Sequence, residues 1–415
     1  VCLRGVDSQP EGLIHNSQMA LSGMGTQADV DLLQSLYDEP WWVQQLAARN
    51  LSAVWQRHWF PHNYEVTAFE AYFDLYQLTG NTLYLDAVDG AWDMFMNNWV
   101  HVGGSMAINE AMFYPPNRQH AAHIALEGGG HPTGELCGSV FWVGLNQRLH
   151  RLRFPASVRY VDQMEAAIVN VGVANQAKPG DGMLGIRYFA LLHGNKQFPT
   201  NHATCCEGQG TRLFGSLPEY VFSTHAGGVS VDLYTSATFS TQLPAGKVSI
   251  DMDADFPLSS SFTLTATASA VMTLSLRVPG WCTSNVTFGV DGSPGPTGAP
   301  GSYVALNVSA GTTTVSADFP RELTPHAYTG LTQVPGYKRY AYTLGPVLLA
   351  VVGPLDATAG AVVVPLQDGQ DPARPADWME PTGEPLTYSL PGGLTAMPYY
   401  GITGNTTFDV YPLFQ

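Results

Sequence analysis

Hydrophobic periodicity divides the chain into a first part of predicted helices and a second part of predicted strands. Up to about residue 226, apolar side chains recur every three to four positions, which is the spacing of an amphipathic helix. The range 64–78 shows it most clearly, and Gly80 shortly afterwards is a typical helix end. Helices in pairs joined by glycine-rich loops indicate an α/α toroid or solenoid. The predicted helices cover residues 29–37, 41–55, 64–78, 83–99, 136–149, 157–171 and 210–221.

Beyond about Gly227 apolar and polar residues alternate, which predicts half-buried antiparallel strands. Several such strands at short spacing are typical of a β-sandwich. The composition of residues 292–301 indicates a loop, and that of residues 368–385 indicates a surface excursion before a last strand at 406–412. The apolar run 347–352 has the length of a strand. The alternating strands cover residues 229–234, 247–252, 262–267, 271–278, 286–290 and 313–319.

These patterns predict an α+β multidomain protein with three regions. Residues 1–226 form a helical domain, residues 227–325 a β-sandwich, and residues 326–415 a second β-rich region that completes the sandwich domains. Too few helices precede residue 64 to complete a toroid. We therefore expect the N-terminal part of the toroid to lie outside this chain, for instance on a separate chain.

Composition and charge exclude several classes of partner. The 415 residues include 18 basic and 34 acidic ones, which gives a formal net charge of -16. Binding to a nucleic-acid backbone needs basic patches, so we expect no nucleic-acid partner. No apolar run approaches the roughly 20 residues that a membrane span requires. The balance favours an uncharged or cationic ligand.

Sequence signals of compartment favour a secreted protein. Asn-x-Ser/Thr sequons at Asn50, Asn285, Asn307 and Asn405 predict glycosylation in a secretory pathway. The chain opens at Val1 without a signal peptide, so we interpret it as processed or incomplete. A cytosolic protein with chance sequons is the alternative.

Four residues in two short motifs have the chemistry of a metal site. Glu135 and Cys137 belong to one motif, and Cys205 and Cys206 to the other. Adjacent cysteines do not easily bond to each other, whereas three thiols and one carboxylate suit tetrahedral Zn²⁺. An extended segment before the helix would point Glu135 and Cys137 to one side. The alternative is that these cysteines are small buried hydrophobic residues.

The remaining two cysteines and two further carboxylates have simpler interpretations. Cys2 and Cys282 could form a disulfide that links the start of the chain to the sandwich. Glu110 follows a glycine-rich turn and could serve as a general acid/base or be merely solvated. We expect Glu207 to cap the helix that follows it.

Several motifs resemble glycoside hydrolase families 127 and 146, the β-L-arabinofuranosidases. The paired cysteines with the upstream Glu-x-Cys are the most specific of them. The resemblance runs from about residue 64 to the end of the chain, and the motifs follow the family's order. The further matching segments are Gly103-Gly-Ser with Glu110, Tyr76-Gln-Leu-Thr-Gly, Leu276-Arg-Val-Pro-Gly-Trp281 and Tyr342-Thr-Leu-Gly-Pro-Val-Leu.

The resemblance implies a six-hairpin α/α toroid that holds the active site, followed by β-sandwich domains. It implies Zn²⁺ bound by the four motif residues, Cys205 as the nucleophile and Glu110 as the acid/base of a retaining hydrolase. Tyr188 and His202 are implied sugar contacts. His62 lies near, but is not aligned with, a histidine usual in the family. Other histidines near these motifs are His101, His120, His123 and His131.

We therefore predict a secreted, zinc-dependent retaining glycoside hydrolase that acts on L-arabinofuranosides or related sugars of glycoproteins or cell-wall glycans. One departure from the family stands out, because Glu207-Gly-Gln-Gly follows the cysteine pair where many members have Pro-Pro-Asn. Two hypotheses compete with the prediction. The first is a non-catalytic structural or carbohydrate-binding component of an extracellular assembly, and the second is another toroid enzyme such as a polysaccharide lyase.

Overall fold

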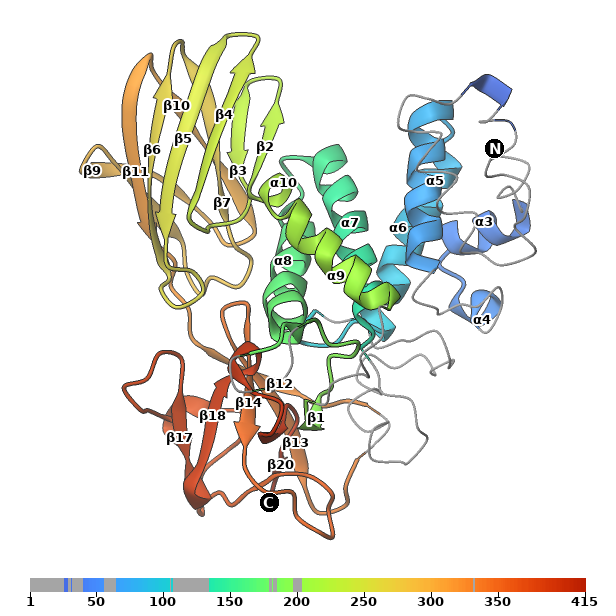
Figure 1. Ribbon diagram of the computed structural model, residues 1–415, viewed down its shortest axis with the longest axis vertical. Coiled ribbons are helices and arrows are strands. Elements are labelled where there is room, and N and C mark those ends of the chain that lie inside the picture. The colour runs from blue at the N-terminus through green and yellow to red at the C-terminus, as the bar shows by residue number, and fades with distance from the viewer. Residues whose placement is uncertain are drawn as a thin grey trace.

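The computed structural model combines helices and sheets in one α+β multidomain fold, as predicted (Figure 1). It describes residues 26–28, 31, 40–55, 65–104, 106, 134–178, 181, 185–196, 204–330 and 333–415. Helices occupy the first part of the chain, and two further regions are built of strands. None of the described helices combines the length and apolar character needed to cross a membrane. The domain boundaries near residues 226 and 325 stay predictions.

The described helices lie where hydrophobic periodicity predicts them, but some differ from the predicted ranges in length. The predicted helices at 64–78 and 83–99 are confirmed almost to the residue, whereas the single helix predicted at 41–55 is wrong. Arg49 has a positive φ of 56°, and this left-handed residue divides the range into two helices. The helices are α3 (Pro40–Ala47), α4 (Leu51–Val54), α5 (Glu65–Thr79), α6 (Thr82–Asn98), α7 (Leu136–Arg153), α8 (Val158–Ala167), the π-helix η3 (Ile168–Val173), α9 (Cys205–Ser216) and α10 (Pro218–Val221).

The helical core is packed around aromatic residues of α6 and α7. Trp142 is fully buried and stacks on Trp92, with ring centroids 5.7 Å apart. The Trp92 indole N–H donates to the Asn146 amide oxygen at 2.9 Å, so the donor of this ring is satisfied, whereas the buried Trp142 indole N–H has no hydrogen-bond partner among the described residues. Gly90 lets α3 approach α6 closely, because a Cβ there would lie 1.8 Å from the Leu46 carbonyl oxygen.

Two sheets follow α10 and share one hydrophobic core. A four-stranded sheet has the order β10-β7-β3-β2, and a six-stranded sheet has the order β4-β5-β6-β11-β8-β9. Val231 and Leu276 of the first sheet and Ile250 and Leu264 of the second belong to the same buried cluster. The strands are β2 (Phe222–His225), β3 (Gly228–Val231), β4 (Ala237–Leu243), β5 (Gly246–Ala254), β6 (Ser261–Ala268), β7 (Met272–Val278), β8 (Val286–Val290), β9 (Ser293–Gly298), β10 (Ser302–Val308) and β11 (Gly311–Asp318).

The loop predicted at residues 292–301 is wrong, because most of it forms strand β9. This strand pairs with β8 alone, at the edge of the six-stranded sheet. Proline removes a backbone donor, and an edge strand tolerates that loss. Pro294 and Pro296 are therefore compatible with a strand here, although their composition suggests a loop.

The C-terminal region is a ten-stranded sheet that includes one strand from the helical part of the chain. Its strand β14 (Val347–Val352) matches the predicted apolar run, and β1 (His193–Asn195) comes from the segment before α9. The range 368–385 contains only short elements but buries Trp378 in the core, so it covers the sheet and is not a pure surface excursion. The other strands are β12 (Leu323–Ala327), β13 (Lys338–Leu344), β15 (Val363–Val364), β16 (Glu380–Pro381), β17 (Tyr388–Leu390), β18 (Leu394–Pro398), β19 (Thr407–Asp409) and β20 (Leu413–Phe414).

The Leu276-Arg-Val-Pro-Gly-Trp281 motif joins the four-stranded sheet to helix α8. Arg277 is fully buried, and its guanidinium donates to Asp162 at 2.9 Å and to Glu165. The Trp281 indole N–H donates to the second oxygen of Glu165 at 2.7 Å. The backbone N–H of Gly280 donates to Asp162 at 3.1 Å. The motif therefore holds the helical domain against the sheet region.

Candidate metal centre

The candidate site lies where helices α7 and α9 begin. Thr204 caps α9 in a capping box with Glu207. The Glu207 N–H donates to the Thr204 hydroxyl at 3.3 Å, and the Thr204 N–H donates to the Glu207 carboxylate at 2.9 Å. The capping role predicted for Glu207 is confirmed. The predicted helix start at residue 210 is wrong, since the capping box starts the helix at the cysteine pair.

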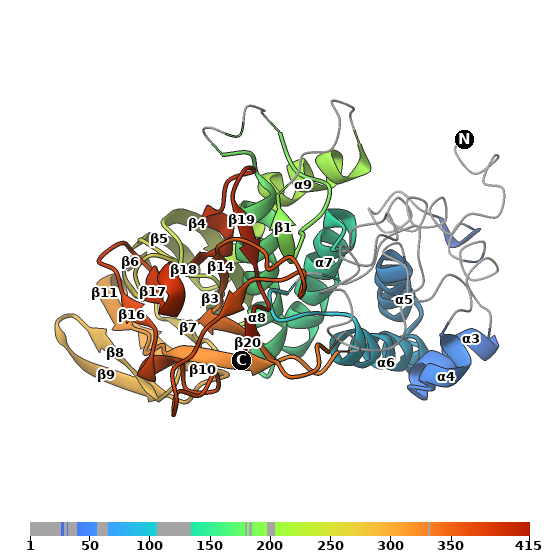
Figure 2. The ribbon, with the colours of Figure 1, turned by 90° about the horizontal axis from the view of Figure 1, so that it is seen from below.

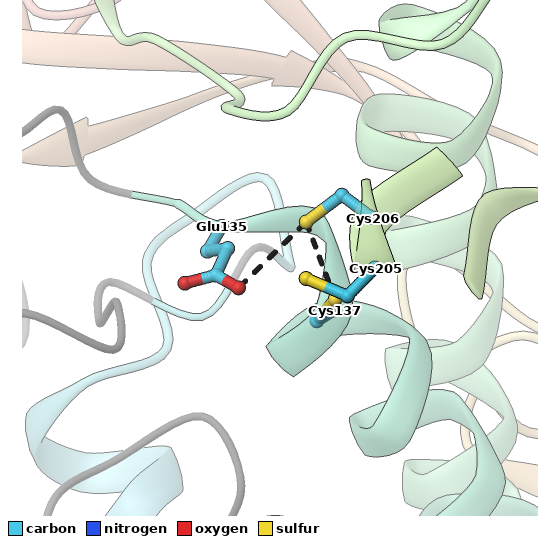
Figure 3. Close-up of side chains that lie close together, drawn as sticks. All are labelled: Glu135, Cys137, Cys205 and Cys206. Atoms are coloured by element: carbon cyan, nitrogen blue, oxygen red, sulfur yellow. Dashed lines mark hydrogen bonds between the residues drawn. The ribbon is translucent and has the colours of Figure 1, made fainter. Parts of the chain in front are cut away.

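The four predicted ligands come together in space (Figure 3). The Cys137 and Cys206 sulfurs lie 3.2 Å apart, and the Cys206 sulfur lies 3.7 Å from a Glu135 carboxylate oxygen. One ligand atom from each of Glu135, Cys137, Cys205 and Cys206 lies within 4.8 Å of every other. The expectation of an extended segment at 135–137 is only half right. Glu135 pairs with Phe189 in a β-bridge, but Cys137 is already in the first turn of α7.

Burial separates the four residues into two kinds. Glu135, Cys137 and Cys206 are buried, whereas Cys205 is exposed. Helix α9 approaches α7 this closely because Gly210 has no side chain. A Cβ there would lie 2.8 Å from Ile186 and 3.1 Å from Leu136. The structure thus presents one thiol to solvent beside three buried candidate ligands.

The electrostatics of the cluster suit a bound cation. Hydrogen bonds with the neighbouring thiols, followed by burial, raise the pKa of Cys137, and burial raises the pKa of Cys206. Ionised together, these groups would place several like charges in a buried volume. A divalent cation offsets that repulsion, and the N-termini of α7 and α9 add partial positive charge. The donor set of three sulfurs and one carboxylate oxygen fits zinc.

Tyr188 lies beside the exposed thiol, with its hydroxyl oxygen 3.5 Å from the Cys205 sulfur. Two backbone hydrogen bonds hold it there. The Leu136 N–H donates to the Tyr188 carbonyl at 2.9 Å, and the Ala190 N–H donates to the Gly134 carbonyl at 2.8 Å. The strand-like pairing of 134–136 with 188–190 therefore places Tyr188 next to the cluster.

Several predicted residues lie outside the described ranges. They are Glu110, His62, His202 and Cys2, together with His120, His123 and His131. Cys282 is buried and forms no disulfide with any described residue. His101 is also buried. The sequon residues Asn50, Asn285, Asn307 and Asn405 are all exposed.

Two contributors to the site were not predicted from the sequence. The Thr204-Cys-Cys-Glu207 pattern is a capping-box signature and would have located the start of α9. The pairing of the Tyr188 segment with Gly134–Leu136 gives no local signal, because it joins positions far apart along the chain.

Fold and site together define a class, namely an α+β multidomain protein with a Glu–Cys₃ centre in its helical domain. Two family profiles match this chain. The profile described as "Beta-L-arabinofuranosidase, GH127 catalytic domain" matches residues 41–219, and that of the GH127 middle domain matches residues 228–321. The chain belongs to glycoside hydrolase family 127, whose members are β-L-arabinofuranosidases.

One known relative is distant in sequence. A non-reducing end β-L-arabinofuranosidase of Bifidobacterium longum subsp. longum is 24% identical over 196 residues. The match covers 43% of this chain and 29% of that protein, so it spans less than a third of the relative's length.

Solved structures support the fold at low identity. A GH127 β-L-arabinofuranosidase from Geobacillus stearothermophilus T6 superposes with a TM-score of 0.67 at 16% identity, covering 99% of this chain and 72% of that one. A second GH127 β-arabinofuranosidase superposes with a TM-score of 0.73 at 16% identity, covering 99% and 69%. At such identities the likeness concerns the fold alone.

Proposed function

We propose that this protein is a zinc-dependent retaining glycoside hydrolase with a cysteine nucleophile. Its substrates would be L-arabinofuranosides or related sugars of glycoproteins or cell-wall glycans. The observation that carries the proposal is the exposed Cys205 thiol beside three buried ligands, in a chain matched by the family's catalytic-domain profile.

The different exposure of the three thiols supports different roles for them. Cys137 and Cys206 are buried and serve only as ligands, together with Glu135. Cys205 is the thiol that a substrate can reach. A zinc ion bound by the four residues would keep the thiols deprotonated at neutral pH. The thiolate, not the thiol, is the nucleophile.

Two displacements then give overall retention. In the first, the Cys205 sulfur attacks the anomeric carbon, and the C–S bond forms as the glycosidic C–O bond breaks. The Glu110 carboxylic acid protonates the departing oxygen. In the second, the Glu110 carboxylate takes a proton from water, the water oxygen bonds to the anomeric carbon, and the C–S electron pair returns to sulfur.

Substrate contacts follow from position and from the family resemblance. The Tyr188 hydroxyl lies 3.5 Å from the Cys205 sulfur and would meet a sugar bound there. His202 is a proposed sugar contact on the resemblance alone, as Glu110 is the proposed acid/base. His62 is proposed only because it lies near the position of a histidine usual in the family.

The direct test is the release of L-arabinose from an aryl β-L-arabinofuranoside. We expect Cys205→Ser to lower kcat by at least about 1,000-fold and Glu110→Gln by about 100- to 10,000-fold. Cys282→Ala is the matched control and should retain activity. Activity that survives both site substitutions would refute the mechanism. Zinc binding without hydrolysis of any glycoside would instead support the non-catalytic, carbohydrate-binding alternative.

We also propose that the protein is secreted and glycosylated. The exposure of all four sequon asparagines supports this, since an oligosaccharide needs a surface position. Expression in a eukaryotic secretory host should give a product whose mass falls on endoglycosidase treatment, and an unchanged mass would refute glycosylation. A Cys2–Cys282 disulfide belongs to the same proposal, and peptide mapping under non-reducing conditions tests it.

The finer architecture is likewise a proposal. The helix pairs α5–α6 and α7–α8 would belong to a six-hairpin α/α toroid, and the two sheets that share one core would form a β-sandwich. An experimental structure of the chain tests both.

A further inference from the structure

Residues 185–196, here called the bridging segment, connect the metal centre to the C-terminal sheet. At one end, residues 188–190 pair with 134–136 beside the ligand Glu135. At the other end, β1 pairs with β19, with His193 opposite Asp409 and Asn195 opposite Thr407. Figure 2 shows β1 and β19 side by side. The segment therefore contacts both regions with its backbone.

A buried pair of side chains locks the segment onto the C-terminal sheet. The Lys196 ammonium donates to the Tyr399 carbonyl at 2.6 Å and to the Ala174 carbonyl at 3.2 Å. It lies 3.9 Å from the centre of the Tyr399 ring. The Tyr399 hydroxyl in turn donates to the Leu191 carbonyl at 2.7 Å. Lys196 thus bonds to the backbone of the C-terminal region, and Tyr399 bonds to the backbone of the bridging segment.

The contact between Lys196 and Tyr399 buries a lysine side chain, which is energetically unfavourable. Lys196 is only 2% exposed, and within the described ranges no carboxylate forms an ion pair with it. Burial lowers the pKa of this lysine well below its usual range. A buried charge without a counter-charge is destabilising unless hydrogen bonds and an aromatic face replace its hydration. Both replacements are present, and they fix the ammonium at one point of the segment.

We propose that Lys196 and Tyr399 are positioning residues for the metal centre. By fixing the bridging segment, they hold Tyr188 against Cys205 and keep the β-bridge that orients Glu135. The C-terminal sheet then helps to position the site, although it supplies none of the four proposed ligands. The effect on turnover rests on the proposed hydrolase function, whereas the effect on the metal centre does not.

The test compares two chemically identical substitutions. Tyr399→Phe removes the hydroxyl that bonds to Leu191. Tyr342→Phe removes the hydroxyl of an equally buried tyrosine in β13, which donates to the Pro372 carbonyl at 2.9 Å away from the segment. Both should lower the melting temperature by similar amounts. Only Tyr399→Phe should raise the zinc dissociation constant, by about 10-fold or more, in competition with a chelator. Lys196→Met, which keeps the length of the side chain, should do the same.

A second readout keeps the test decisive if the chain binds no zinc. Iodoacetamide should alkylate the buried Cys206 of the metal-free Tyr399→Phe protein at least about 10-fold faster than in wild type, because the site opens more often, with Tyr342→Phe unchanged. In the active enzyme, kcat should fall with little change in KM. Equal zinc affinity and equal alkylation rates in wild type and Tyr399→Phe would overturn the proposal, even if the hydrolase function holds. If wild type hydrolyses no substrate, zinc affinity and the alkylation rate still test whether Lys196 and Tyr399 position the metal centre.

Discussion

The sulfur atoms of Cys137 and Cys206 lie 3.2 Å apart although 69 positions separate the two residues in the chain. Each occupies the first turn of a helix, and Gly210 allows those two helices to meet. Glu135 and Cys205 flank the pair and complete the cluster. The centre therefore depends on how α7 and α9 pack.

The first prediction concerns metal content. We expect one zinc ion per chain, and a dissociation constant raised by more than about 100-fold in Cys206→Ser, because a buried hydroxyl replaces a thiolate ligand. Metal analysis after dialysis, with chelator competition, measures both. Cys282→Ala removes a buried sulfur outside the cluster and should leave zinc content unchanged. Full zinc content in Cys206→Ser would contradict the ligand assignment.

Local patterns in the sequence predict the elements better than they predict their junctions. The apolar run 347–352 becomes β14, and the helical period at 64–78 becomes α5 with a shift of one residue. Composition misleads at β9, because an edge strand tolerates the two prolines. In α9, glycines at positions 208 and 210 hide the helix start that the Thr204–Glu207 box imposes.

The proposed ligand set could be predicted from residue types and the family resemblance. The tertiary contacts that hold these residues in place could not. Lys196 and Tyr399 are 203 positions apart, and Arg277 and Glu165 are 112 apart. No local pattern links such residues, because packing between domains alone decides which of many polar groups meet. Tertiary contacts of this kind can be identified only in the folded structure.

The second prediction concerns the junction at Arg277. We expect Arg277→Met to destabilise the protein by about 3–5 kcal/mol, because it leaves the nearly buried Glu165 without its counter-charge. Arg374→Met is the matched control, since Arg374 and Asp377 form an exposed ion pair worth less than about 1 kcal/mol. Urea unfolding of the three proteins makes the comparison. Equal midpoints for Arg277→Met and wild type would contradict the structural role.

The third prediction concerns pH. Burial raises the pKa of Glu65 to about 8, from 4.5 for an ordinary glutamate. Between these values the folded chain keeps a proton that the unfolded chain releases. The free energy of unfolding should then fall as pH rises, by up to about 1.4 kcal/mol per pH unit. Glu65→Gln has no proton to lose and should remove this contribution.

Urea unfolding of wild type and Glu65→Gln at several pH values between about 5 and 8 measures the effect. The variant should gain stability relative to wild type as the pH rises through this range. A constant difference between the two proteins would show that Glu65 is ionised in the folded state.

The central claim, that Cys205 is the nucleophile of a retaining hydrolase, has one direct measurement. Glu110→Gln should form the glycosyl–enzyme from an aryl β-L-arabinofuranoside with a good leaving group, and then hydrolyse it slowly for want of a base. Peptide mass spectrometry of the quenched protein should find one anhydropentose attached to the sulfur of Cys205. A covalent sugar on another residue, or turnover of wild type with inversion at the anomeric carbon, would contradict the account.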